Sequence, residues 1–267
     1  MAFDKLIDSA KLESAMLATA NAIREKTGGT APIEWDPTTG FKSAIDEITV
    51  GGGDVPVDPD PREQYQRVEY ITSDGASYII TDFIGDNSSG LEIIASFPTL
   101  ADRIPMGSRL DSGTTRFYCV YPMSASSIYY GFNTGSTISC QLKVDTIYRL
   151  QTNFQNSRLV NVYNTAGTRL GGGSISATLT QQTVPVSIFG YHYSSTGAVS
   201  SKRAFDLYCA RCSRGHDVVR EYIPCYRKSD GVIGVYEKFT GQFLTNGGDG
   251  AFTKGPDIEW DNTTIAA

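Results

Sequence analysis

The chain has 267 residues, with 23 Lys and Arg against 29 Asp and Glu, so its formal net charge is −6. Charged residues make up 19% and hydrophobic residues 40%, a balance that excludes extended disorder for most of the chain. An acidic chain with no basic N-terminal cluster argues against a nucleic-acid partner, and the lack of a run of about 18 apolar residues argues against membrane insertion.

Residues 1–50 are predicted to form a short two-helix module. Apolar residues recur at helical spacing from Leu12 to Ile23, and again at i, i+3, i+4 and i+7 from Phe41 to Ile48. Both apolar stripes are thin, so two such helices bury too little surface to be stable alone. We therefore expect the module to anchor the chain to other proteins and to assemble a homo-oligomer, a trimer in particular.

Residues 51–64 are predicted to be a linker. Three glycines at 51–53 favour flexibility, and the alternating prolines that follow favour an extended, stiffer chain. The charge distribution changes at the same place. Residues 1–64 carry six basic and twelve acidic side chains, whereas residues 65–267 carry seventeen of each. The sequence thus predicts a domain boundary near residue 64.

Residues 65–267 are predicted to form an antiparallel β-sandwich of two sheets, of the jelly-roll kind. Apolar and polar residues alternate with a period of two, and turn signals such as Ser73-Asp74-Gly75 and Gly171-Gly172-Gly173 separate the segments. About twelve short strands without intervening helices favour this fold class. The expected strands are Arg67–Ile71, Ser77–Phe83, Leu91–Phe97, Arg116–Tyr121, Ile128–Phe132, Ile138–Val144, Tyr148–Phe154, Leu159–Tyr163, Val186–Phe189, Ala204–Ala210, Val218–Ile223 and Gly231–Tyr236.

The five cysteines are odd in number and widely spaced, which favours reduced thiols. Cys209 and Cys212 have the spacing of a metal or redox pair, but no second pair completes a zinc site. We expect Cys209 to share a buried strand face with Phe205 and Leu207, where it acts as a small apolar residue.

Several segments resemble known proteins. Residues 221–236 (EYIPCYRKSDGVIGVY), with 240–248, and the opening residues 68–79 (VEYITSDGASYI) resemble both ends of laminin-G-like, concanavalin A-like domains of bacteriophage tail and fibre proteins. Residues 20–28 resemble the N-terminal helical module of tail-associated phage proteins. The resemblance implies a virion protein, made in the host cytoplasm without a signal peptide, whose domain binds a host receptor. Residues 98–199 resemble nothing that can be named.

The residues do not favour an enzyme or a bound cofactor. Glycoside hydrolysis needs two carboxylates flanking one bond, but the strand of Glu92 holds no second acid, and Glu221 is separated from Asp217 by an expected turn. A calcium site remains open, because Asp82, Asp86 and Asn87 offer oxygen ligands within six residues. The alternative is an Asx turn in which these side chains cap their own backbone.

Binding is the function class that the residues favour. The glycan-binding candidates are the tyrosines Tyr129 and Tyr130 at one turn and Tyr191, His192 and Tyr193 at another. Aromatic faces stack on sugar rings, and loops between rigid strands carry recognition. Two hypotheses remain open. The chain is a fibre or tail protein that binds a host-surface glycan, or it is a structural virion protein, such as a head fibre or decoration protein, that binds none.

Overall fold

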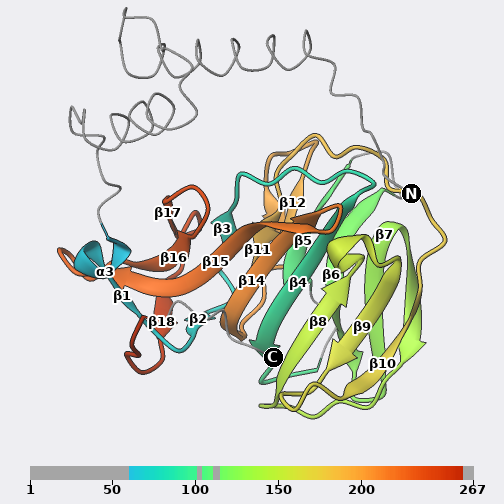
Figure 1. The fold of residues 1–267 in the computed structure, drawn as a ribbon, viewed down its shortest axis with the longest axis horizontal. Helices are drawn as coiled ribbons and strands as arrows, with labels where there is room; N and C mark the ends of the chain where they lie inside the picture. Colours follow the sequence, from blue (N-terminus) through green and yellow to red (C-terminus); the bar gives the residue numbers. More distant parts are fainter. Residues whose placement is uncertain (1–59, 101–103, 111–114, 261–267) are drawn as a thin grey trace, which may run out of the picture. The chain divides into compact units, whose positions relative to one another are not determined.

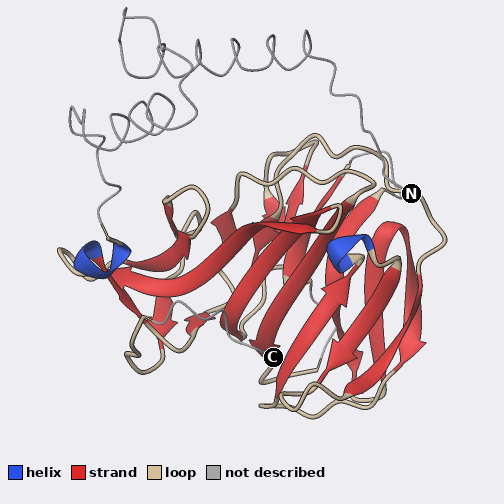
Figure 2. Cartoon of the chain, viewed as in Figure 1, coloured by secondary structure: helices blue, strands red, loops and turns tan. Residues whose placement is uncertain are grey.

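The computed structural model describes residues 60–100, 104–110 and 115–260 (Figure 1). The predicted helices of residues 1–50, their expected trimer contacts, and residues 51–59 of the predicted linker lie outside the described residues. Within the described ranges the fold is an antiparallel β-sandwich of two sheets with almost no helix, as Figure 2 shows. The prediction of a mainly β two-sheet sandwich is therefore confirmed.

The larger sheet has the strand order β10-β9-β8-β4-β14-β15-β16-β17, with β1 paired to β15 and β2 lying between β14 and β18. Its strands are β1 (Tyr65–Arg67), β2 (Ile71–Ser73), β4 (Ser89–Ser96), β8 (Ile147–Thr152), β9 (Leu159–Tyr163), β10 (Arg169–Ser174), β14 (Asp206–Arg214), β15 (Asp217–Arg227), β16 (Ile233–Glu237), β17 (Phe243–Thr245) and β18 (Phe252–Lys254).

The smaller sheet has the order β13-β12-β5-β11-β3, and β6 joins β5 to β7 at its side. Its strands are β3 (Ile79–Ile80), β5 (Met106–Arg109), β6 (Arg116–Ser124), β7 (Ser127–Ser139), β11 (Ser187–Ile188), β12 (Gly190–Tyr193) and β13 (Val199–Ser200). Among the described strand pairs, only β5 and β12 run parallel. The short helices are α3 (Pro61–Gln64), within the predicted linker, and the 3₁₀ turn η1 (Phe154–Asn156). No helix in these ranges is long and apolar enough to cross a bilayer.

The core lies between the two sheets and follows the period-two pattern. In β8, Tyr148 and Leu150 are buried, while Arg149 and Gln151 lie on the opposite face of the strand and are partly exposed. The smaller sheet contributes Phe117 and Phe132, whose rings pack edge to face at 6.1 Å. One face of each sheet thus packs into the core, and the opposite face is available to bind a ligand.

A β-bulge changes which face the cysteines occupy. The pairing of β14 with β4 shifts by one residue between Leu207 and Cys209, so the alternation reverses there. Cys209 therefore lies outside the main core cluster, whereas Ala210 and Cys212 lie within it. The expectation that Cys209 shares a face with Leu207 is wrong. Burial raises the pKa of both Cys209 and Cys212, which favours unreactive thiols.

Candidate functional site

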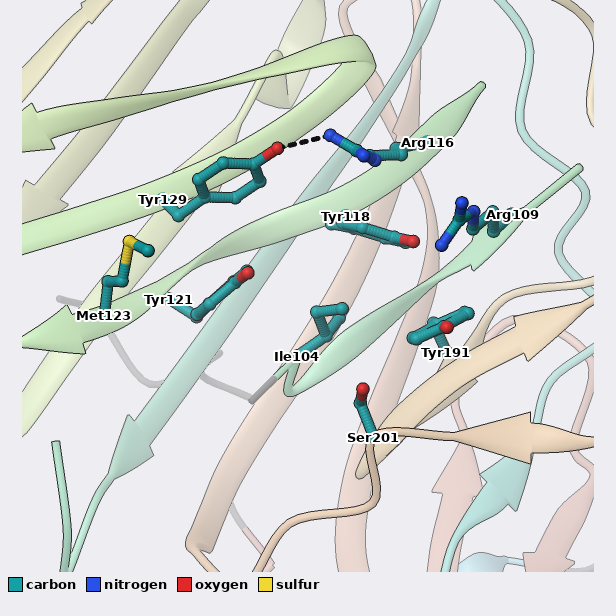
Figure 3. Close-up of a pocket in the computed structure, with 9 residues that line it drawn as sticks. All are labelled: Ile104, Arg109, Arg116, Tyr118, Tyr121, Met123, Tyr129, Tyr191 and Ser201. Atoms are coloured by element: carbon teal, nitrogen blue, oxygen red, sulfur yellow. Dashed lines mark hydrogen bonds between the residues drawn. The ribbon is translucent and has the colours of Figure 1, made fainter. Parts of the chain in front are cut away.

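A pocket opens on the outer face of the smaller sheet, away from the core (Figure 3). Its volume is about 290 Å³. Four tyrosines, two arginines, two apolar side chains and one serine line it: Ile104, Arg109, Arg116, Tyr118, Tyr121, Met123, Tyr129, Tyr191 and Ser201. Among the described residues, its lining includes no carboxylate. Strands β5, β6, β7 and β12 supply most of these side chains, so a rigid sheet positions them.

Two glycines allow the central ring to lie against the sheet. Gly107 of β5 pairs with Tyr118 of β6 on one side and with Tyr191 of β12 on the other, and Gly131 of β7 pairs with Tyr118. A Cβ atom at Gly107 would lie 2.7 Å from Cδ1 of Tyr118, and one at Gly131 would lie 2.8 Å from Cδ2. The ring occupies the space of two missing side chains. Its centroid is 5.2 Å from that of Tyr191.

A second pair of rings extends the aromatic surface. The centroids of Tyr121 and Tyr129 are 5.6 Å apart. Residues three apart in a regular strand point to opposite faces, but Tyr118 and Tyr121 both lie at this pocket. The reason is a bulge in β6, because the pairing with β7 shifts between these two residues. The bulge therefore brings all four rings to one face.

The two arginines lie together at one end of the pocket. Arg109 and Arg116 are direct cross-strand partners in β5 and β6. Arg116 donates from Nη1 to Oη of Tyr129 at 2.6 Å, and the guanidinium carbon of Arg109 lies 5.4 Å from the ring centroid of Tyr193. Burial raises the pKa of Tyr118, so its hydroxyl stays neutral at physiological pH. Tyr118 thus places a neutral hydroxyl beside the guanidinium groups.

The structure separates the five predicted glycan-binding residues. Tyr129 and Tyr191 line the pocket, and Tyr193 adjoins it, edge to face with Tyr191 at 6.2 Å. Tyr130 instead packs against the core cluster. His192 is 8% exposed, with Nδ1 3.1 Å from the carbonyl oxygen of Pro185. These last two do not line the pocket, because neighbours in a strand alternate between faces.

Sequence reasoning missed Tyr118, Tyr121, Arg109 and Arg116. Their strands were only partly foreseen, since β5 was not predicted at all. A signal did exist in the residues Arg116-Phe117-Tyr118, where polar and aromatic side chains alternate around a core residue. That pattern identifies an outer face carrying Arg and Tyr, but it does not say which strands lie beside it.

Glu92 and Glu221, which lie far apart in the sequence, lie close together in the larger sheet. Asp217 and Glu221 lie in one strand, β15, so the expected turn between them is wrong. Arg211 of β14 joins Glu221 to Glu92 of β4, with Arg211 Nη1 2.6 Å from Glu92 Oε1 and Arg211 Nη2 3.1 Å from Glu221 Oε1. Both carboxylates are almost fully buried. An ion-paired, buried arrangement of this kind stabilises the sheet and offers a substrate no access.

The three candidate calcium ligands, Asp82, Asp86 and Asn87, each accept hydrogen bonds from other protein groups. Asp82 accepts three hydrogen bonds from Arg220, the shortest at 2.6 Å, and Asp86 accepts from the backbone and hydroxyl of Ser88. Asn87 Oδ1 accepts from the backbone of residue 179 at 2.9 Å. Over the described ranges no group of three or more His, Cys, Asp or Glu side chains could hold a metal ion. Asp86 thus caps its own backbone, as expected for an Asx turn.

The Asp82–Arg220 pair predicts a loss of stability in acid. Hydrogen bonds from Arg220 lower the pKa of Asp82, so the pair contributes full stability above the usual carboxyl pKa of about 4. That contribution disappears as the pH falls through the lowered pKa. We expect Asp82→Asn to melt below the wild type at pH 7 and to approach the wild-type melting temperature as the pH falls through the lowered pKa of Asp82, as measured by thermal unfolding. The control is Asp217→Asn, which removes an exposed carboxylate, and a constant difference at all pH values would contradict the prediction.

Comparisons with known proteins identify no family. No protein-family model matches the sequence, and a search of curated proteins finds no match. Among solved structures, the chain is similar to a candidate carbohydrate-binding protein from Bacteroides ovatus, with 13% identity, a TM-score of 0.47, and coverage of 72% of this chain and 62% of that one. It is also similar to a heptameric SAP-like pentraxin from Limulus polyphemus, with 11% identity, a TM-score of 0.41, and coverage of 55% and 76%. The chain thus spans less than two thirds of the Bacteroides protein.

Proposed function

We propose that the β-sandwich is a non-catalytic module that binds a saccharide in the tyrosine-lined pocket. The observation that carries this proposal is the pocket itself, in which Tyr118, Tyr121, Tyr129 and Tyr191 surround an open space on a rigid sheet. The rings offer flat apolar faces for a sugar ring, while hydroxyl and guanidinium groups at the rim can bond sugar hydroxyls. No reaction is assigned to the site, because the side chains described in its lining include no paired carboxylates and no nucleophile beside a base.

The biological setting that we propose is the surface of a bacteriophage particle, on a tail or fibre. The terminal segments of the sandwich resemble domains of such proteins, and an acidic N-terminal segment followed by a Gly/Pro linker suits a module projected from an anchor. Each stacked ring contributes about 1 kcal/mol, so a single site should bind weakly. A trimer assembled through residues 1–50 would present three sites and raise the apparent affinity by avidity.

Substitution of pocket tyrosines tests the proposal. Tyr129→Ala and Tyr191→Ala in the intact chain should each weaken binding to bacterial wall or capsular polysaccharides about fivefold, because each removes one stacking face. The matched control is Tyr163→Ala, since Tyr163 lies in β9 of the other sheet, where Arg149 covers its ring at 4.4 Å. Binding that survives both pocket substitutions would reject the site. An intact chain that binds no envelope polysaccharide would favour the structural virion protein instead.

A further inference from the structure

We propose that the sandwich carries a second binding site, for the carboxylate or phosphate groups of an anionic glycan, on the outer face of the larger sheet. Arg149 of β8 and Arg169 of β10 supply its positive charge, and β9 lies between these two strands (Figure 1). The tyrosine-lined pocket lies on the smaller sheet. The second site therefore adds to the proposed saccharide binding and can be tested apart from it.

The register of three strands brings both arginines over β9. Arg149 and Arg169 are the two cross-strand partners of Tyr163, one on each side. The guanidinium carbon of Arg149 lies 4.4 Å from the ring centroid of Tyr163, and Nε of Arg169 donates to Oδ1 of Asn161 at 2.8 Å. Asn161 and Tyr163 share one face of β9, about 7 Å apart along the strand. Both guanidinium groups therefore lie over one short stretch of β9.

A glycine makes room for the side chain of Arg169. Gly172 of β10 pairs with Asn161, and a Cβ atom at this glycine would lie 2.7 Å from Nη2 of Arg169. The pairing of β10 with β9 shifts between Arg169 and Gly171, so residues 169 and 172 lie on the same face of the sheet. The guanidinium group can thus fold back over β9 instead of extending past the edge of the sheet.

Neither arginine forms an ion pair within the residues that the structure describes. The side chain of Arg149 donates no hydrogen bond there, and that of Arg169 donates one, to a neutral amide. The carboxylate of Glu92, on the same face of β4, already bonds Arg211 and Gln151. The positive charge over β9 is therefore left without a carboxylate partner in the described ranges, and an anionic ligand would supply one.

The chemistry of the site favours an anionic glycan over other anions. A guanidinium group has five N–H donors in a planar fork, which matches the paired oxygens of a carboxylate or phosphate. Arg169 is exposed and Arg149 is partly exposed, so a ligand can reach both. Arg149 covers the ring of Tyr163, which leaves little aromatic surface for stacking nucleobases, and the chain is acidic overall. A glycan also agrees with the saccharide binding proposed for the pocket.

The test uses the intact chain and probes that differ in charge. The probes are hexagalacturonate, its methyl ester, a phosphodiester-linked oligosaccharide of the same length, and single-stranded DNA of six nucleotides. By titration calorimetry, at least one anionic glycan should bind about tenfold or more tightly than the methyl ester, and more tightly than the DNA, with affinity falling as salt is raised. The two anionic glycans distinguish a carboxylate ligand from a phosphate ligand.

Substitutions connect the charge preference to the site. Arg149→Gln and Arg169→Gln should each weaken binding of the anionic glycan about tenfold and leave binding of the methyl ester within about twofold. Asn161→Asp keeps both arginines but places a carboxylate beside Arg169, so it should weaken anionic binding by a similar factor. The control is Arg214→Gln, which removes an exposed arginine 3.4 Å from Asp86 and should have no effect.

Tyr163 acts as a positioning residue, because its ring lies against Arg149. Tyr163→Ala should weaken binding of the anionic glycan about threefold, and Tyr163→Phe, which keeps the ring, should bind it like the wild type. Neither substitution should alter binding of an uncharged saccharide. Tyr163→Ala therefore serves as a control for the tyrosine-lined pocket when the polysaccharide carries no charge.

The outcomes separate the second site from the pocket. Equal affinity for the anionic glycans and the methyl ester, or tighter binding of the DNA than of both glycans, would overturn the second site. Anionic binding that is unchanged in Arg149→Gln, Arg169→Gln and Asn161→Asp, with wild-type circular dichroism, would overturn it as well. If no uncharged saccharide binds but the anionic glycan binds through the arginines, the pocket loses its proposed function and the second site stands.

Discussion

Replacing Arg211 with methionine should cause a large loss of stability. Arg211 lies between Glu92 and Glu221, which are 2% and 5% exposed. Removing the cation leaves Glu92 without its ion-pair partner and Glu221 with Lys238, which lies 3.1 Å away. Breaking a buried pair of this kind typically costs about 3–5 kcal/mol of unfolding free energy. For a domain of this size we expect the melting temperature to fall by about 10 °C. Urea unfolding of the intact chain measures the same loss directly.

A second ion pair supplies a control with the same shortest distance between nitrogen and oxygen but different burial. Arg227 and Asp230 approach to 2.6 Å, the distance found for Arg211 and Glu92, yet both of their side chains are about 40% exposed. Arg227→Met should therefore change stability little, because water and salt screen an exposed pair. A loss as large as that of Arg211→Met would show that distance, not burial, decides the effect.

Replacing Glu92 and Glu221 with glutamine in the Arg211→Met variant should restore stability. In the triple variant Arg211→Met, Glu92→Gln, Glu221→Gln, none of these three positions carries a charge, and Gln151, which donates to Glu92, can still bond the new amide. We expect the triple variant to recover at least half of the loss, since buried ion pairs can often be replaced by neutral groups at small cost. No recovery would mean that Arg211 acts mainly by filling space.

The fold class was predictable because alternation of apolar and polar residues is local. The predicted strand Leu159–Tyr163 is observed with the same bounds, and the turns at Gly75 and Gly231 have the positive φ that glycine favours. Gly171-Gly172-Gly173 was interpreted as a turn but lies inside β10. There, a Cβ at residue 172 would lie 2.0 Å from a backbone oxygen of β9, so close packing of strands, rather than a turn, requires the glycine.

The site was only half predictable because it depends on register between strands far apart in sequence. Tyr129 and Tyr191 are visible as aromatic residues near turns, but 62 positions separate them. What brings them to one pocket is the pairing of β12 with β5, of β5 with β6 and of β6 with β7. The bulge beside Tyr118 leaves no local signal either, because it is an extra residue relative to the partner strand.

Substituting Gly131 with alanine should disturb the pocket without touching a ligand. The new Cβ would lie 2.8 Å from Cδ2 of Tyr118, so the ring must move from the position in which it packs against the ring of Tyr191. We expect a loss of about 1–3 kcal/mol in unfolding free energy from overpacking. Saccharide affinity should fall about tenfold or more, because the displaced ring closes the space in which a sugar would stack. Titration calorimetry and urea unfolding of the intact chain measure the two effects.

A double-mutant cycle shows whether the ring is the cause. In a Tyr118→Ala background the alanine at position 131 has no ring to displace, so the stability cost of Gly131→Ala should shrink by more than half, even though Arg116 Cβ remains 2.9 Å from the new methyl group. Gly173→Ala is the matched control, because its Cβ would meet only the end of the flexible Ile138 side chain, at 3.1 Å. An unchanged cost in the Tyr118→Ala background would attribute the strain to Arg116 and the backbone. The packing of Tyr118 on two glycines would then not be what shapes the pocket.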